Sequence, residues 1–103
     1  MRDQVFIELW VSLASLLRSY TAAHGLNRVR QATVELGEER IKVRHGDAWL
    51  DLQRNGALIR WEREDGSTGA LELTESGLLR AGDDGREEEM DMVAERWARE
   101  LMA

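Results

Sequence analysis

The stretch ATVELGEERIKVRHGDAWLDLQRNGALIRWERE, residues 32–64, decides the fold of this 103-residue chain. Apolar and polar residues alternate along it, which is the pattern of β-strands that bury one face. Turn signals interrupt the alternation at Glu38-Glu39, Gly46-Asp47 and Asn55-Gly56. We therefore predict an antiparallel meander, which a further turn at Asp65-Gly66 extends toward residue 80.

The turns also predict the register in which the strands pair. Two-residue loops, of type I′ at Asn55-Gly56, would bring the apolar residues of neighbouring strands opposite each other. Two apolar rows then share one sheet face: Leu36, Ile41, Leu52 and Ile59, and Val34, Val43, Leu50 and Trp61. A slip of one residue would move these side chains to the other face, so the three turns support one another.

The opposite sheet face is predicted to be exposed and charged. One row on it alternates in sign, and Glu72 joins this row if the next loop pairs Leu71 with Trp61. The row reads Glu35, Lys42, Asp51, Arg60 and Glu72. Opposite charges paired across strands contribute about 0.2–1 kcal/mol each. On the neighbouring row Arg44 lies beside Trp49, which suits a cation–π contact on a partly exposed tryptophan.

A helix is predicted on either side of this segment in the sequence. Residues 3 to 24 carry a narrow polar stripe at helical spacing and are apolar around most of the remaining circumference. The stripe consists of Gln4, Glu8, Ser12, Ser15 and Ser19. After a short strand at Leu78-Leu79 and a capping turn over residues 82–85, a second helix is predicted from about Arg86 to Leu101, with Trp97 on its apolar stripe.

These elements predict a single α+β domain over residues 1–103. The domain is a two-layer sandwich, in which an N-terminal helix, an antiparallel meander of five to six strands and a C-terminal helix follow one another, with both helices on one sheet face. Trp61 and Trp97 are expected in the core between the layers.

Composition narrows the classes of function. The net charge of −6 opposes binding to nucleic-acid phosphates. The absence of cysteine excludes disulfides and thiolate chemistry and suits the cytoplasm. Asp3 cancels the charge of Arg2, and Glu8 interrupts the apolar segment, so we expect neither a signal peptide nor a membrane span.

No arrangement of residues typical of catalysis or cofactor binding is found in the sequence. His24 and His45 lie in different predicted elements, and neither a cysteine pair nor an HExxH motif accompanies them. The serines of the first helix lack a G-x-S-x-G motif, and no phosphate-binding glycine loop occurs. We therefore expect no catalytic residue, no cofactor and no enzyme.

An acidic cluster begins at Asp83 and Asp84 and runs into the second predicted helix. Glu88, Asp91 and Glu95 would share one flank of that helix, where like charges repel. The flank could bind a hard cation or a basic partner weakly. Alternatively, the acids stabilise the helix N-terminus and keep the protein soluble, and we favour this structural interpretation.

The layout of helix, antiparallel sheet and acidic helix, with an exposed sheet tryptophan at Trp49, resembles that of frataxin-like iron-handling proteins. The resemblance covers most of the chain and is one of element order. It implies an acidic accessory protein that handles iron or another cation, and this is the alternative function. The first helix, which carries an acidic ridge in that family, is mostly apolar here.

The apolar first helix indicates a protein partner. Its apolar circumference is wider than one sheet face can cover, so Val5, Phe6 and Val11 are expected to face another subunit. Trp49, on the open sheet face, is a further expected contact residue. We therefore expect a non-catalytic interaction or accessory module that forms a homodimer through its N-terminal helix, or that binds another protein.

Overall fold

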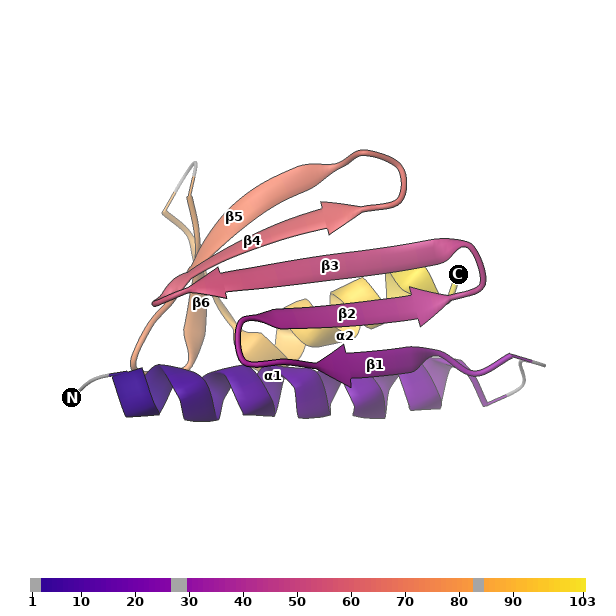
Figure 1. Cartoon of the computed structure of the whole chain (residues 1–103), viewed down its shortest axis with the longest axis horizontal. Coiled ribbons are helices and arrows are strands. Elements are labelled where there is room, and N and C mark those ends of the chain that lie inside the picture. Colours follow the sequence, from indigo (N-terminus) through magenta and orange to yellow (C-terminus); the bar gives the residue numbers. More distant parts are fainter. Residues whose placement is uncertain (1–2, 27–29, 83–84) are drawn as a thin grey trace.

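The computed structural model describes residues 3–26, 30–82 and 85–103. Helix α1 (Asp3–His24) comes first, seven strands follow, and helix α2 (Met90–Leu101) ends the chain. The strands are β1 (Thr33–Leu36), β2 (Arg40–His45), β3 (Ala48–Asn55), β4 (Leu58–Arg63), β5 (Thr68–Leu73), β6 (Leu78–Ala81) and β7 (Glu87–Glu89). They form one antiparallel sheet in chain order, from β1 to β7 (Figure 1). The predicted α+β class is confirmed, with more strands than expected.

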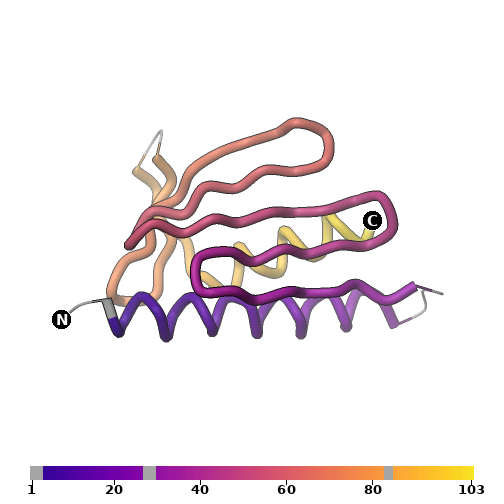
Figure 2. Tube along the Cα trace, viewed as in Figure 1, coloured from indigo at the N-terminus to yellow at the C-terminus, as the bar shows by residue number. Residues whose placement is uncertain are grey.

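Both helices pack on one side of the sheet. In Figure 1, α2 lies behind β2 and β3, and α1 runs along the β1 side. The trace in Figure 2 shows the β4–β5 hairpin bending away from β3 at its far end. The core between the layers combines α1, the sheet and α2: Trp10, Leu13, Ala14, Leu17, Ile41, Val43, Leu50, Leu52, Ile59, Leu73, Leu79, Met90, Val93, Ala94, Trp97 and Leu101. In the described part of the chain, neither helix combines the length and apolarity that a membrane crossing requires.

The register of the first three strands agrees with the prediction. Leu36 pairs with Ile41, and the turn between these strands lies at Glu38 and Glu39. His45 pairs with Ala48 across Gly46, whose positive φ of 63° suits a two-residue hairpin loop. The apolar row positions on β2 and β3 are therefore buried against the helices.

The register between β3 and β4 differs from the prediction by two residues. Asn55 pairs with Leu58, so the loop consists of Gly56 and Ala57, and Leu52 rather than Leu50 faces Trp61. Gly56 has φ +62°, and no described residue other than glycine has a positive φ. A type I′ loop needs a positive φ at both central positions, whereas type II′ needs it only at the first, which Gly56 occupies. A shift of two residues leaves every side chain on its predicted face.

The shifted register interrupts the predicted charge row. Glu35, Lys42 and Asp51 follow one another as expected, but Asp51 then faces Glu62 instead of Arg60. The β4–β5 loop was also predicted incorrectly, since Leu71 pairs with Ile59 and Trp61 pairs with Gly69. Gly66, with φ +89°, lies in a loop closed by the bond from Arg63 N to Ser67 O, so the loop begins one residue earlier than the predicted pairing requires.

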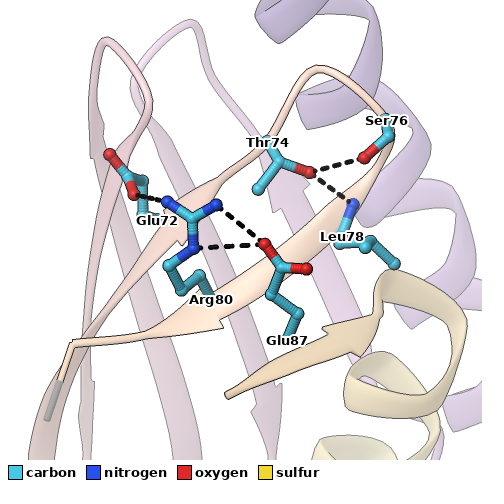
Figure 3. A network of polar contacts seen from close by, with 6 residues as sticks. All are labelled: Glu72, Thr74, Ser76, Leu78, Arg80 and Glu87. Carbon is cyan, nitrogen blue, oxygen red and sulfur yellow. Dashed lines mark hydrogen bonds and ion pairs between the residues drawn. The ribbon is translucent and has the colours of Figure 1, made fainter. Parts of the chain in front are cut away.

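A second alternating charge row lies across the last three strands (Figure 3). Arg80 on β6 lies between Glu72 of β5 and Glu87 of β7, with Nη–Oε distances of 2.7 Å to each. In the turn before β6, Thr74 Oγ1 accepts a hydrogen bond from the Leu78 amide at 3.0 Å. The alternation predicted for one continuous row is therefore present as two shorter rows, one at each end of the sheet.

Asp51 is more buried than predicted. Only 7% of the residue is exposed, although it lies on the face away from the helices. Arg40, its diagonal neighbour on β2, donates to both carboxylate oxygens, from Nε at 2.8 Å and from Nη2 at 2.9 Å. The predicted register matched only directly opposite residues. It therefore missed this diagonal ion pair, which two parallel hydrogen bonds hold.

The C-terminal helix begins four residues later than predicted. Glu87–Glu89 form strand β7, and the Ala81 amide donates to Arg86 O at 2.8 Å, so the preceding glycines close a hairpin rather than cap a helix. Glu89 is the N-cap residue and makes no side-chain capping bond. Asp91 alone is acidic in the first helical turn. Asp83 and Asp84, expected to belong to the cap, lie outside the described residues.

Candidate interaction surface

A groove between α1 and the β1–β2 turn is lined by exposed apolar side chains. Ile7 and Val11, one helical turn apart on α1, are 40% and 47% exposed, and Leu36 at the end of β1 is 36% exposed. The groove has a volume of about 770 Å³. We call it the α1 groove. It is lined by Ile7, Trp10, Val11, Leu36, Gly37, Glu38, Glu39 and Arg54.

Trp10 holds the two walls of the α1 groove together. Its indole is buried, and Nε1 donates a hydrogen bond to the Gly37 carbonyl at 3.0 Å. Buried indoles usually find such a partner. The turn is thereby fixed to the helix, while the first turns of α1 extend past it (Figure 1). The acids Glu38 and Glu39 are both exposed and add charge to the groove.

The structure divides the predicted contact residues of α1 into two groups. Val11 is exposed in the α1 groove, as expected. Val5 and Phe6 are half-buried, and Phe6 packs against the core. Sequence reasoning missed Ile7 and Leu36. The spacing of Ile7 and Val11 by four residues was a signal for the first, whereas the position of Leu36 depends on where the β1–β2 turn meets the helix.

Trp49 lies half-buried on the open sheet face, as predicted. Its cation–π partner is Lys42, whose Nζ lies 4.9 Å from the ring centroid, and not Arg44. Arg44 is directly opposite Trp49 and Lys42 is diagonal to it, but diagonal neighbours remain within reach of long side chains. The Trp49 amide donates to Glu64 Oε1 at 3.0 Å.

A shallow hollow of about 580 Å³ lies farther along the open face, over β3, β4 and β5. Polar groups of Asp51, Arg60 and Glu62 line it together with apolar groups of Leu58 and Ala70. The Asp51 carboxylate is bonded to Arg40. The hollow therefore combines one occupied carboxylate with the exposed charges of Arg60 and Glu62.

The acids proposed as a weak cation site each contact another side chain. Glu88, on β7 and not on the helix, accepts from Arg96 at 2.7 Å. Asp91 Oδ1 accepts from the Tyr20 hydroxyl at 2.6 Å. Glu95 lies 2.9 Å from His24 Nε2 and also binds Arg99. These contacts give each acid a partner within the fold, but they differ from the predicted stabilisation of the helix N-terminus, since only Asp91 lies in the first turn of α2. Within residues 3–26, 30–82 and 85–103, no three acidic, histidine or cysteine side chains are grouped as a metal site.

Two of these contacts join the helices near the C-terminal end of α1. Tyr20 and His24 lie one turn apart on α1, and their partners Asp91 and Glu95 lie one turn apart on α2. The hydrogen bond to the Asp91 carboxylate raises the pKa of Tyr20 above its ordinary value of 10.0, with smaller contributions from burial and from the charges of Asp91 and Glu95. A bond that favours the neutral phenol over the phenolate explains the direction.

We expect Tyr20 to ionise at a higher pH in the folded protein than in the unfolded chain. Because its folded pKa is raised, its contribution to stability is fully present below about pH 10 and is lost as the pH rises through the folded value. The phenolate absorbance measures this directly, since the chain has a single tyrosine. Asp91→Asn should move the midpoint back toward that of the urea-unfolded chain. Equal midpoints for the folded and unfolded wild type would contradict the prediction.

Comparison of the whole chain with protein-family models, with curated proteins and with solved structures gave no match.

Proposed function

We propose that the chain is a non-catalytic cytoplasmic interaction module that forms a homodimer through the α1 groove and the adjoining exposed face of α1. One observation carries the proposal: Ile7, Val11 and Leu36 come from two elements and meet at one groove with their apolar side chains exposed. Grouped exposed apolar side chains are typical of interaction sites, whereas single ones are ordinary.

The surroundings of the groove fit a protein interface better than a small-molecule pocket. Protein interfaces combine an apolar centre with a polar rim, and here Glu38, Glu39 and Arg54 stand beside the apolar side chains. In a twofold dimer each of these residues contributes two buried side chains, one from each subunit. Burial contributes roughly 25 cal/mol per Å² of apolar surface, part of which offsets the entropy of association.

We expect Ile7→Glu combined with Val11→Glu to give a folded monomer, because both substitutions place charge on a surface that only the dimer buries. Light scattering over a range of concentrations measures the mass, and circular dichroism checks the fold. Met92→Glu is the matched control, since Met92 is an exposed apolar residue on α2, outside the α1 groove. This variant should remain dimeric.

A wild-type protein that stays monomeric at about 100 µM, well above the dissociation constant of a micromolar complex, would overturn the homodimer. Loss of the dimer in Met92→Glu alone would place the interface on α2 instead. In the dimer proposed here, Trp49 and the open sheet face remain available to a further protein.

A further inference from the structure

The exposed face of α1 carries two charges of opposite sign, one toward each end. Glu8 lies near the N-terminus and Arg18 ten residues later, and both side chains are exposed. Neither side chain forms an ion pair or hydrogen bond with another residue in the described ranges. Most other charged side chains near the helices, such as Asp91 and Glu95, do have such partners.

The residues between these charges suit close contact with another helix. Val11 is 47% exposed, and Ser12 and Ser15 are exposed on the same face. Small side chains allow two helices to approach to the short end of the usual range of about 8–10 Å between axes. The same face adjoins Ile7, so the charged positions border the apolar surface that carries the proposed function.

The order of the charges favours one orientation of a second copy. Ten residues of helix span about 15 Å, so two α1 helices that cross near the level of Leu13 in antiparallel orientation place Glu8 of one subunit next to Arg18 of the other. A parallel pair would instead place Glu8 against its own copy and Arg18 against its own copy. Like charges in an interface oppose association.

We propose that the two α1 helices of the homodimer pack antiparallel, with Glu8 of each subunit paired to Arg18 of the partner subunit. This inference depends on the proposed homodimer and specifies its geometry. The twofold axis passes near Val11 and Ser15, and each dimer contains the ion pair twice. The occupant of this helix face is therefore a second copy of the chain, whose own α1 carries the complementary charges in the required order.

Charge exchange tests the pairing. Glu8→Arg and Arg18→Glu should each weaken the dimer about tenfold or more, because each variant replaces two attractive contacts by two repulsive ones. The double variant should recover the wild-type dissociation constant to within about threefold, since it reverses each pair without removing it. The losses should shrink as salt is added, because exposed charge pairs are screened. In a parallel dimer the single variants would cause no such loss.

Cross-linking tests the orientation independently of these charges. The chain has no cysteine, so single cysteines can be introduced cleanly. In the antiparallel dimer, Ser15→Cys should form a disulfide with its own copy, whereas Gln4→Cys should form one only when mixed with Ala22→Cys. Self-linking of Gln4→Cys would indicate a parallel dimer.

The outcomes separate the two proposals. A wild-type monomer at all concentrations overturns both. A dimer that Ile7→Glu and Val11→Glu disrupt, but whose dissociation constant does not respond to either charge variant, overturns the antiparallel pairing and leaves the proposed function in place. Weakening by both single variants without recovery in the double variant also contradicts the pairing, because independent destabilising effects would add.

Discussion

Trp97→Ala is expected to lower the free energy of unfolding by about 3–5 kcal/mol, the range for removal of a buried large aromatic side chain. Trp97 on α2 is only 6% exposed and contacts Trp61 edge to face, with 6.5 Å between ring centroids. Such a loss is a large part of the stability of a small domain. Urea unfolding followed by circular dichroism measures it.

Trp49→Ala is the matched control for this prediction. Trp49 is half-buried on the open face and packs under Lys42 rather than between the layers. Removal of the Trp49 side chain should lower the free energy of unfolding far less than removal of the Trp97 side chain. If Trp49→Ala unfolded the chain and Trp97→Ala did not, the assignment of the buried face would be wrong. Trp61, expected in the core, is only half-buried and packs against the core at its edge, where it contacts Trp97.

Gly69→Ala is expected to destabilise the protein by about 1–3 kcal/mol, the range for overpacking. Gly69 faces Trp61 across β4 and β5, and a Cβ atom there would lie 2.6 Å from three atoms of the indole ring. The ring cannot move aside without disturbing its contact with Trp97. The strand therefore needs glycine at this position for space, although glycine is otherwise unfavourable within strands.

A double-mutant cycle identifies the cause. With Trp61 replaced by alanine, Gly69→Ala should leave the free energy of unfolding unchanged or raise it slightly. The ring atoms that the new Cβ would contact are then gone, and alanine loses less chain entropy on folding than glycine. Gly82→Ala is the control, since its Cβ would lie 3.5 Å from the nearest atom, an ordinary contact. An equal cost of Gly69→Ala with and without Trp61 would contradict this explanation. Urea unfolding is again the measurement.

The parts of the fold that depend on local pattern could be predicted from the sequence. The bounds of α1 and the pairing of β1, β2 and β3 agree with the polar stripe and the turn residues. The β3–β4 register could not be predicted with the same security, because Asn55-Gly56-Ala57 allows two loops that differ only in which residues take the central positions. Strand β7 was missed because a run of three glutamates resembles a helix start, and its pairing with β6, where Arg80 faces Glu87, is not visible in the local pattern.

The candidate site was predictable only in part. Val11 could be identified, since the sequence of the first helix alone shows that its apolar surface is wider than one sheet face can cover. Leu36 could not, because its exposure depends on how the β1–β2 turn is placed by the Trp10–Gly37 hydrogen bond, between residues 27 positions apart. The partners of Glu88, Asp91 and Glu95 were hidden for the same reason, and their like charges therefore looked more unusual in sequence than they are in the structure.

The chain order of the sheet has a consequence for the folding pathway. Every strand pairs with its neighbours in sequence, so each hairpin closes a short loop at small entropic cost. The contacts between the helices are of the opposite kind, since the bonds from Tyr20 to Asp91 and from His24 to Glu95 each span 71 residues. This topology favours early hairpins and late docking of α1 onto α2. The surface proposed to join two subunits therefore belongs to the element whose long-range contacts close last.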